Sequence, residues 1–182
     1  MRPHVKATLY LGIFVILHFL YDFTHWAFLA PFCGTNESVF QHMKMAFWAY
    51  LCASLIEFAG ARKTNDKKRS FWYPALLSAV SVPWFAALVW YLMPALLGKA
   101  APLVIETTWA ILVTYASGIF AGTVEKAIAK NHFDLSLKVV VIFLSVVSAV
   151  LYVWFTHRPP WIGVFVNPAL LWAHGARSCL PL

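Results

Sequence analysis

Apolar residues form long continuous blocks along this chain, and short polar segments separate the blocks. Hydrophobic residues make up 62% of the 182 residues, whereas charged residues make up only 12%. A soluble domain carries about 25% charged residues. Blocks of about 20 apolar residues, instead of amphipathic stripes, are typical of helices that cross a bilayer. The chain therefore predicts an all-α integral membrane protein.

Five blocks are long enough to span a bilayer, and we expect them to form a single transmembrane domain over residues 1–182. The predicted spans cover residues 7–31, 37–60, 72–97, 103–124 and 135–156. The first block has the basic start of a signal peptide, but it contains His18 and Asp22 and lacks a good cleavage site. We therefore interpret it as a retained first helix.

Basic residues predict the orientation of the chain. Ten of the fourteen lysines and arginines fall on one side of the predicted spans and three on the other, with five of them in the loop at 61–70. Basic loops stay on the cytoplasmic side. We therefore expect an N-in, C-out topology, with the tail at 157–182 folded on the outer face. This distribution also explains the net charge of +7 without nucleic acid, and it favours lipid headgroups as partners.

The segment at 18–44 has an unusual density of ionisable side chains for two apolar spans. These residues are His18, Asp22, His25, Glu37, His42 and Lys44. The first three are spaced at i, i+4 and i+7 and share one face of a helix. Ionisable groups in hydrocarbon cost several kcal/mol unless they are paired, hydrated or metal-bound. The segment therefore predicts a polar site.

The short turn at 33–36 predicts that the first two spans form an antiparallel hairpin. Counting back from the turn, we expect His25 at the depth of His42, Asp22 near Lys44, and His18 deeper in the bilayer. One interpretation is a site for a divalent transition metal ion, with His25, His42 and either Asp22 or Glu37 as ligands. On an ideal helix Glu37 and His42 lie about 140° apart, so Glu37 would need a distorted first turn.

Two other interpretations of these residues remain open. In one, Asp22 pairs with Lys44 and the histidines carry protons, without a metal. In the other, the residues are structural: Glu37 interacts with the dipole of the second helix, and Lys44 extends toward the headgroups. Asn36 is expected to cap the second helix or to add a ligand.

Two further features concern packing and covalent chemistry. Thr114, Gly118 and Gly122 are spaced by four residues and predict a small-residue face for close helix packing. Cys33 and Cys179 are both expected outside, where an oxidising compartment would allow a disulfide.

Two segments resemble a known family. Residues 18–22 read H-F-L-Y-D, and residues 36–44 read N-E-S-V-F-Q-H-M-K. They resemble the H-x-x-Y-[DE] and N-E-S-V-W-E-H-L-K motifs of small prokaryotic multi-pass membrane proteins of unknown function. The tail segment at 159–168 is similar to that family's closing segment. The resemblance implies a bacterial or archaeal cytoplasmic membrane and a shared site around Asn36, Glu37, His42 and Lys44.

The chain departs from the family pattern at Phe40, Gln41 and Asn167, where the family has Trp, Glu and Asp. The loss of two carboxylates weakens a metal site if those groups are ligands. The resemblance brings no activity with it. Three functional classes therefore stay open: a protein with a metal or polar site at the outer leaflet, an accessory subunit with partner membrane subunits, and a proton-linked transporter.

Overall fold

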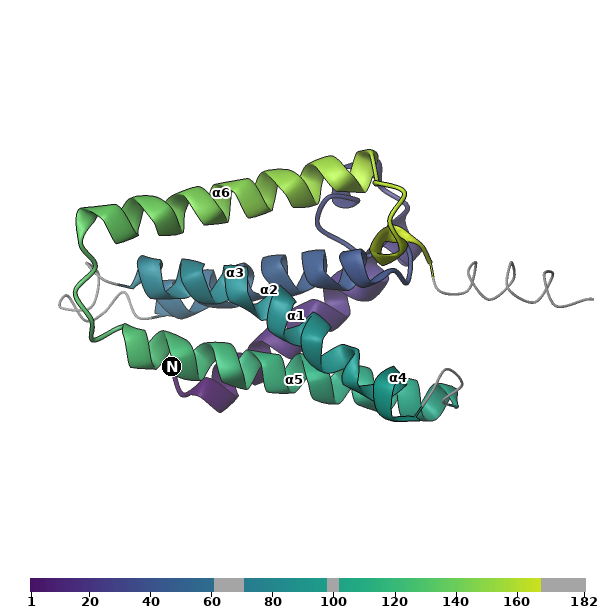
Figure 1. Cartoon of the computed structure of the whole chain (residues 1–182), viewed down its shortest axis with the longest axis horizontal. Coiled ribbons are helices and arrows are strands. Elements are labelled where there is room, and N and C mark those ends of the chain that lie inside the picture. Colours follow the sequence, from purple (N-terminus) through teal and green to yellow (C-terminus); the bar gives the residue numbers. More distant parts are fainter. Residues whose placement is uncertain (61–70, 98–101, 168–182) are drawn as a thin grey trace, which may run out of the picture.

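A computed structural model describes residues 1–60, 71–97 and 102–167, and these residues contain helices and no strand. The long helices are α1 (Pro3–Thr24), α2 (Val39–Gly60), α3 (Trp72–Trp90), α5 (Leu103–Ile128) and α6 (Leu135–His157) (Figure 1). Three short helical elements join or follow them: η1 (Ala27–Leu29), α4 (Leu92–Leu97) and η4 (Gly163–Phe165).

Four of the long helices, α1, α3, α5 and α6, are long and apolar enough to cross a membrane. The all-helical architecture is thus confirmed for the described residues, and it is compatible with a multi-pass membrane protein. The fifth long helix, α2, falls outside this group of four. It carries Gln41, His42, Lys44 and Glu57 among its apolar residues.

Helix α2 lies at the centre of the bundle. Lys44, Phe47 and Tyr50 are among its fully buried side chains. Phe47 contacts Tyr152 of α6 with ring centroids 5.3 Å apart, and Tyr50 contacts Tyr10 of α1 at 5.8 Å. The apolar helices therefore surround the least apolar one, and its polar groups find their partners inside the protein.

Helix α1 ends seven residues earlier than the predicted span at 7–31. Pro3 lies at its start, where a missing N–H costs no hydrogen bond. The helix ends at Thr24 because His25 adopts the left-handed conformation, with φ 53°, while its N–H donates to the carbonyl of Tyr21. This change of φ stops the α-helical hydrogen-bond pattern, and hydropathy alone does not report it.

The third predicted span, 72–97, is broken into α3 and α4 at Tyr91. Pro94 has no N–H to donate to the carbonyl of Trp90 four residues earlier, so the helical pattern is interrupted there. The indole Nε1 of Trp109 on α5 donates to this carbonyl at 3.3 Å. The break therefore leaves a backbone acceptor that a neighbouring helix satisfies.

The small-residue face on α5 packs against α1, as the spacing of Gly118 and Gly122 predicts for close packing. A Cβ atom on Gly118 would lie 2.7 Å from Cδ1 of Tyr10 and 3.1 Å from Cα of Ala7. A Cβ atom on Gly122 would lie 3.3 Å from Pro3. This face is used inside the chain, so it is not free for a partner subunit.

The beginning of the tail returns to α2. The ring of Phe165 in η4 lies 4.5 Å from that of Phe40 and 5.4 Å from that of Phe155, measured between centroids. Residues 168–182 lie outside the described residues, and so does Cys179, the predicted disulfide partner of Cys33. The disulfide stays a prediction.

Candidate functional site

The loop at 25–38 folds back along α1 before α2 begins. The N–H of Gly34 donates to the carbonyl of Leu17 at 3.2 Å, so the loop descends well below the end of α1. Gly34 also packs tightly on α2, because a Cβ atom there would lie 3.0 Å from Sδ of Met45. The loop therefore brings the start of α2 level with His18.

Helix α2 begins with a capped turn. The side chain of Ser38 accepts a long hydrogen bond from the N–H of Gln41 at 3.4 Å, which is the N-cap arrangement. Asn36 acts one step earlier: its Oδ1 accepts from the N–H of Ser38 at 2.9 Å. Asn36 thus orders the turn that precedes the helix, and Glu37 lies between these two residues, outside the helix itself.

Three side chains meet where the loop passes α1, and we call them the His–Glu cluster: His18, Glu37 and His42. One carboxylate oxygen of Glu37 lies 3.6 Å from Nε2 of His18, and the other lies 3.5 Å from Nε2 of His42. One candidate ligand atom from each residue lies within 4.8 Å of the other two. The imidazole rings are 5.5 Å apart between centroids.

Hydrogen bonding orients His42 for a ligand. Its Nδ1 lies 2.9 Å from the carbonyl oxygen of Ser38. Because a carbonyl only accepts, Nδ1 carries a proton in this contact, and Nε2 faces the carboxylate of Glu37. A backbone carbonyl on the other ring nitrogen is the usual outer contact of a metal-bound histidine. Nδ1 of His18 is buried and has no hydrogen-bond partner among the residues that the structure describes.

The structure does not bring Asp22 and His25 into this cluster. Both side chains are exposed, and His25 lies beside Tyr21 with ring centroids 6.1 Å apart. Counting residues back from the turn predicted His25 at the depth of His42, because the count assumed a first helix that continues to residue 31. Since α1 ends at Thr24 and the loop folds back, His42 meets His18, two helical turns before His25.

Lys44 lies away from Asp22, and among the described residues no ion pair joins the two. Its side chain is fully buried, and its ammonium donates to the carbonyl of Ala30 at 2.6 Å and to the hydroxyl of Thr156 at 3.1 Å. Lys44 therefore ties the 25–38 loop to α2 and α6. Cys33 in the same loop is also buried, and this burial raises the pKa of its thiol, with the charge of Lys44 opposing the shift.

A cavity of about 320 Å³ extends from the His–Glu cluster between α1, α2, α3 and α5. Its polar end is formed by the cluster. Most of its wall is apolar, with Phe14, Val15, Ala87 and Ala110 among the lining residues, and Tyr10 and Thr114 lie farther along it. The ring of Phe14 stacks parallel to that of His18, 6.4 Å away between centroids.

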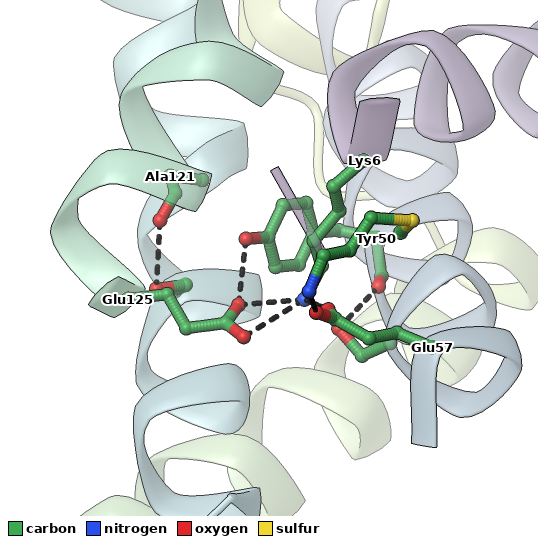
Figure 2. Close-up of polar contacts among 8 residues, drawn as sticks. Lys6, Tyr50, Glu57, Ala121 and Glu125 are labelled. Carbon is green, nitrogen blue, oxygen red and sulfur yellow. Dashed lines mark hydrogen bonds and ion pairs between the residues drawn. The ribbon is translucent and has the colours of Figure 1, made fainter. Parts of the chain in front are cut away.

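A second polar group, the Lys6 cluster, lies at the opposite end of α1 and comprises Lys6, Tyr50, Glu57 and Glu125. Figure 2 shows the Lys6 ammonium between the two carboxylates. Its nitrogen lies 2.8 Å from Glu57, and 2.7 and 2.9 Å from the two oxygens of Glu125. The hydroxyl of Tyr50 donates to Glu125 at 2.8 Å, and the amino group of Met1 pairs with Glu57. Lys6 is only 3% exposed, so this is a buried ion-pair network.

Sequence reasoning missed the Lys6 cluster. It used Lys6 only as one of the ten basic residues that predict the orientation of the chain. The available signal was depth: Lys6, Glu57 and Glu125 all fall at the inner ends of predicted spans, where opposite charges can pair. The cavity had no sequence signal, because its lining residues are ordinary apolar side chains from four separate helices.

These observations define a class: an all-helical protein with four apolar helices of membrane-spanning length and a His–Glu cluster at the end of an apolar cavity. The chain belongs to a family of unknown function, DUF6512, whose family model matches residues 5–170. The match includes the complete His–Glu cluster. Comparisons with curated proteins and with solved structures found no match.

Proposed function

We propose that this protein is a multi-pass membrane protein that binds a divalent transition metal ion through His18, Glu37 and His42. All five long helices span the bilayer in this proposal, with the N-terminus inside and the His–Glu cluster on the outer side. The tail covers the outer end of α2, which the contact of Phe165 with Phe40 supports.

The observation that carries the proposal is the convergence of three ligand atoms within 4.8 Å. Ligands bound to one zinc ion at about 2.0–2.1 Å in tetrahedral geometry lie about 3.3 Å from each other. The two oxygens of Glu37 each lie near one histidine nitrogen, at 3.6 Å from Nε2 of His18 and at 3.5 Å from Nε2 of His42. Small side-chain movements would therefore complete the site.

The ligand chemistry points to a metal that does more than hold the fold together. Two imidazoles and one carboxylate suit zinc, iron, manganese or copper. Structural zinc sites normally use four protein ligands, whereas three leave a coordination position open for water or a substrate. Glu37 is 62% exposed, so a small ligand can reach the His–Glu cluster.

The test is metal analysis by mass spectrometry on protein purified in mild detergent without chelators. We expect about one metal ion per chain in the wild type, and its loss in His18→Ala, Glu37→Gln and His42→Ala. His25→Ala and Asp22→Asn are matched controls, because they remove the same chemical groups from the adjacent turns of α1. Both should keep the metal.

Two results would contradict this proposal. A wild-type protein without metal would return the cluster to a proton-carrying or structural role. Metal loss in His25→Ala equal to that in His42→Ala would instead support the ligand set that the sequence suggested, with His25, His42 and Asp22.

Proton-linked transport is a second candidate, favoured by one observation. The hydroxyl of Tyr10 lies 3.4 Å from Oγ of Ser117, between the two polar clusters on α1. Uptake assays in proteoliposomes with an imposed proton gradient test it: substrate or proton flux that Glu125→Gln abolishes would support transport, and its absence would exclude it.

A further inference from the structure

The cavity beside the His–Glu cluster is lined by residues of α1 and α5, together with residues of α2 and α3. Helices α1 and α5 touch at one end, where the chain leaves no room for side chains on Gly118 and Gly122. Figure 1 shows α1 crossing α5 near its own start and then running away from it toward the start of α2. Large lining residues on both helices are exposed at the rim: Val15, Phe19 and Ile111. The cavity is therefore accessible from the side that lipid would cover.

Its length matches one leaflet. Along α1 the cavity runs from Tyr10 to Phe19, which is about 13 Å at a rise of 1.5 Å per residue. Half of a hydrocarbon core of about 30 Å is about 15 Å. An acyl chain of the outer leaflet would fit this length, with its polar end at the His–Glu cluster.

The charge of the cluster selects the headgroup. A divalent ion bound by one carboxylate and two neutral imidazoles carries a net charge of about +1 and has an open position. The oxygen of a carboxylate headgroup is attracted by this positive charge and can occupy the open coordination position. Without the ion, Glu37 would repel an anionic headgroup.

We propose that the cavity binds a long-chain carboxylate, with the chain along Phe14, Ala87 and Ala110 and the carboxylate on the metal of the His–Glu cluster. This inference rests on the proposed metal site. It goes further, because it assigns the open coordination position to a fatty acid of the outer leaflet.

The experiment measures binding of radiolabelled dodecanoate to the detergent-purified wild type, together with its metal content. Butyrate, which keeps the headgroup and lacks the chain, should compete at least tenfold more weakly than unlabelled dodecanoate. Dodecanol, which keeps the chain and lacks the charge, should also compete at least tenfold more weakly. These comparisons need no variant, so they do not depend on mutant folding.

Two variants test the location. Ala110→Trp fills the cavity and should reduce dodecanoate affinity at least tenfold while it keeps the metal, which also shows that the variant folds. Ala116→Trp is the matched control, because Ala116 is exposed on the same helix and lies outside the cavity lining. It should bind as the wild type does.

The outcomes separate this inference from the proposed function. Metal without dodecanoate binding, butyrate that competes as well as dodecanoate, or unchanged binding in Ala110→Trp would overturn the inference and leave the metal site standing. Dodecanoate binding that Ala110→Trp blocks, in a wild type without metal, would overturn both the metal site and the contact of the carboxylate with the metal, and it would leave only the acyl chain in the cavity.

Discussion

Replacing Lys6 with Met should destabilise the protein strongly. The Lys6 ammonium makes three contacts of 2.7–2.9 Å with two carboxylates and is 3% exposed. Its removal leaves Glu57 paired with the amino group of Met1, and it leaves Glu125 with the hydroxyl of Tyr50 and without the cation it pairs with here. Breaking a buried ion pair by removing one partner costs about 3–5 kcal/mol. For a chain of this size that corresponds to a fall of about 6–20 °C in Tm.

The assay is thermal unfolding in mild detergent, followed by tryptophan fluorescence. Lys126→Met is the matched control, because Lys126 follows Glu125 on α5 and is exposed; its unfolding free energy should change by less than about 0.5 kcal/mol. The double variant with Lys6→Met and Glu125→Gln should recover part of the loss, since it removes the uncompensated charge. Equal Tm values for Lys6→Met and Lys126→Met, or no recovery in the double variant, would refute the reasoning.

Three further predictions concern packing, the loop and the thiol. Gly118→Val should lower the free energy of unfolding by about 1–3 kcal/mol in the same assay, because α1 leaves no room for a Cβ atom there. Gly12→Ala is the control: a Cβ atom at Gly12 would have no atom within 4 Å, so this variant should be neutral or up to about 1 kcal/mol more stable. Lys44→Met should release the 25–38 loop, so metal loss during dialysis against a chelator should be faster than in the wild type. Loss at the wild-type rate would contradict the tethering role. In a variant in which serine replaces Cys52 and Cys179, Cys33 is the cysteine that remains. Its thiol should react with iodoacetamide far more slowly in native than in denatured protein. Because burial raises the pKa of the Cys33 thiol, thiolate forms only above the usual pH range, so native labelling should increase at higher pH; equal rates in both states would contradict its burial.

Hydropathy predicted the long helices well, because each is an apolar block with a breaker at its end. The predicted spans at 103–124 and 135–156 lie within α5 and α6, whose ends differ by only a few residues. The break at Tyr91 was also readable in principle, since Pro94 removes a backbone donor. The end of α1 was not, because nothing in the composition of the segment requires His25 to adopt a positive φ.

That single backbone feature decided how much of the site the sequence could predict. The three residues of the His–Glu cluster lie in the segment at 18–44, and His18, Glu37 and His42 were among its candidates. Their grouping could not be predicted, because the depth of His42 depends on how the 25–38 loop folds. Glu37 reaches the histidines from the loop, so projection onto a helix could not place it.

In the proposed topology, the buried polar groups of α2 have a consequence for membrane insertion. A lysine costs about 2.5–3.5 kcal/mol during insertion when it lies at the centre of a helix, and less toward the ends. Lys44 lies in the second turn of α2. This helix also carries Gln41, His42 and Glu57. Its partners are synthesised much later: Glu125 follows Tyr50 by 75 residues, and Thr156 follows Lys44 by 112. The polar side chains of α2 therefore lack these partners until α5 and α6 have been synthesised. A nascent chain that stops after α3 would expose uncovered polar groups to lipid, which makes such a fragment a natural substrate for membrane quality-control proteases.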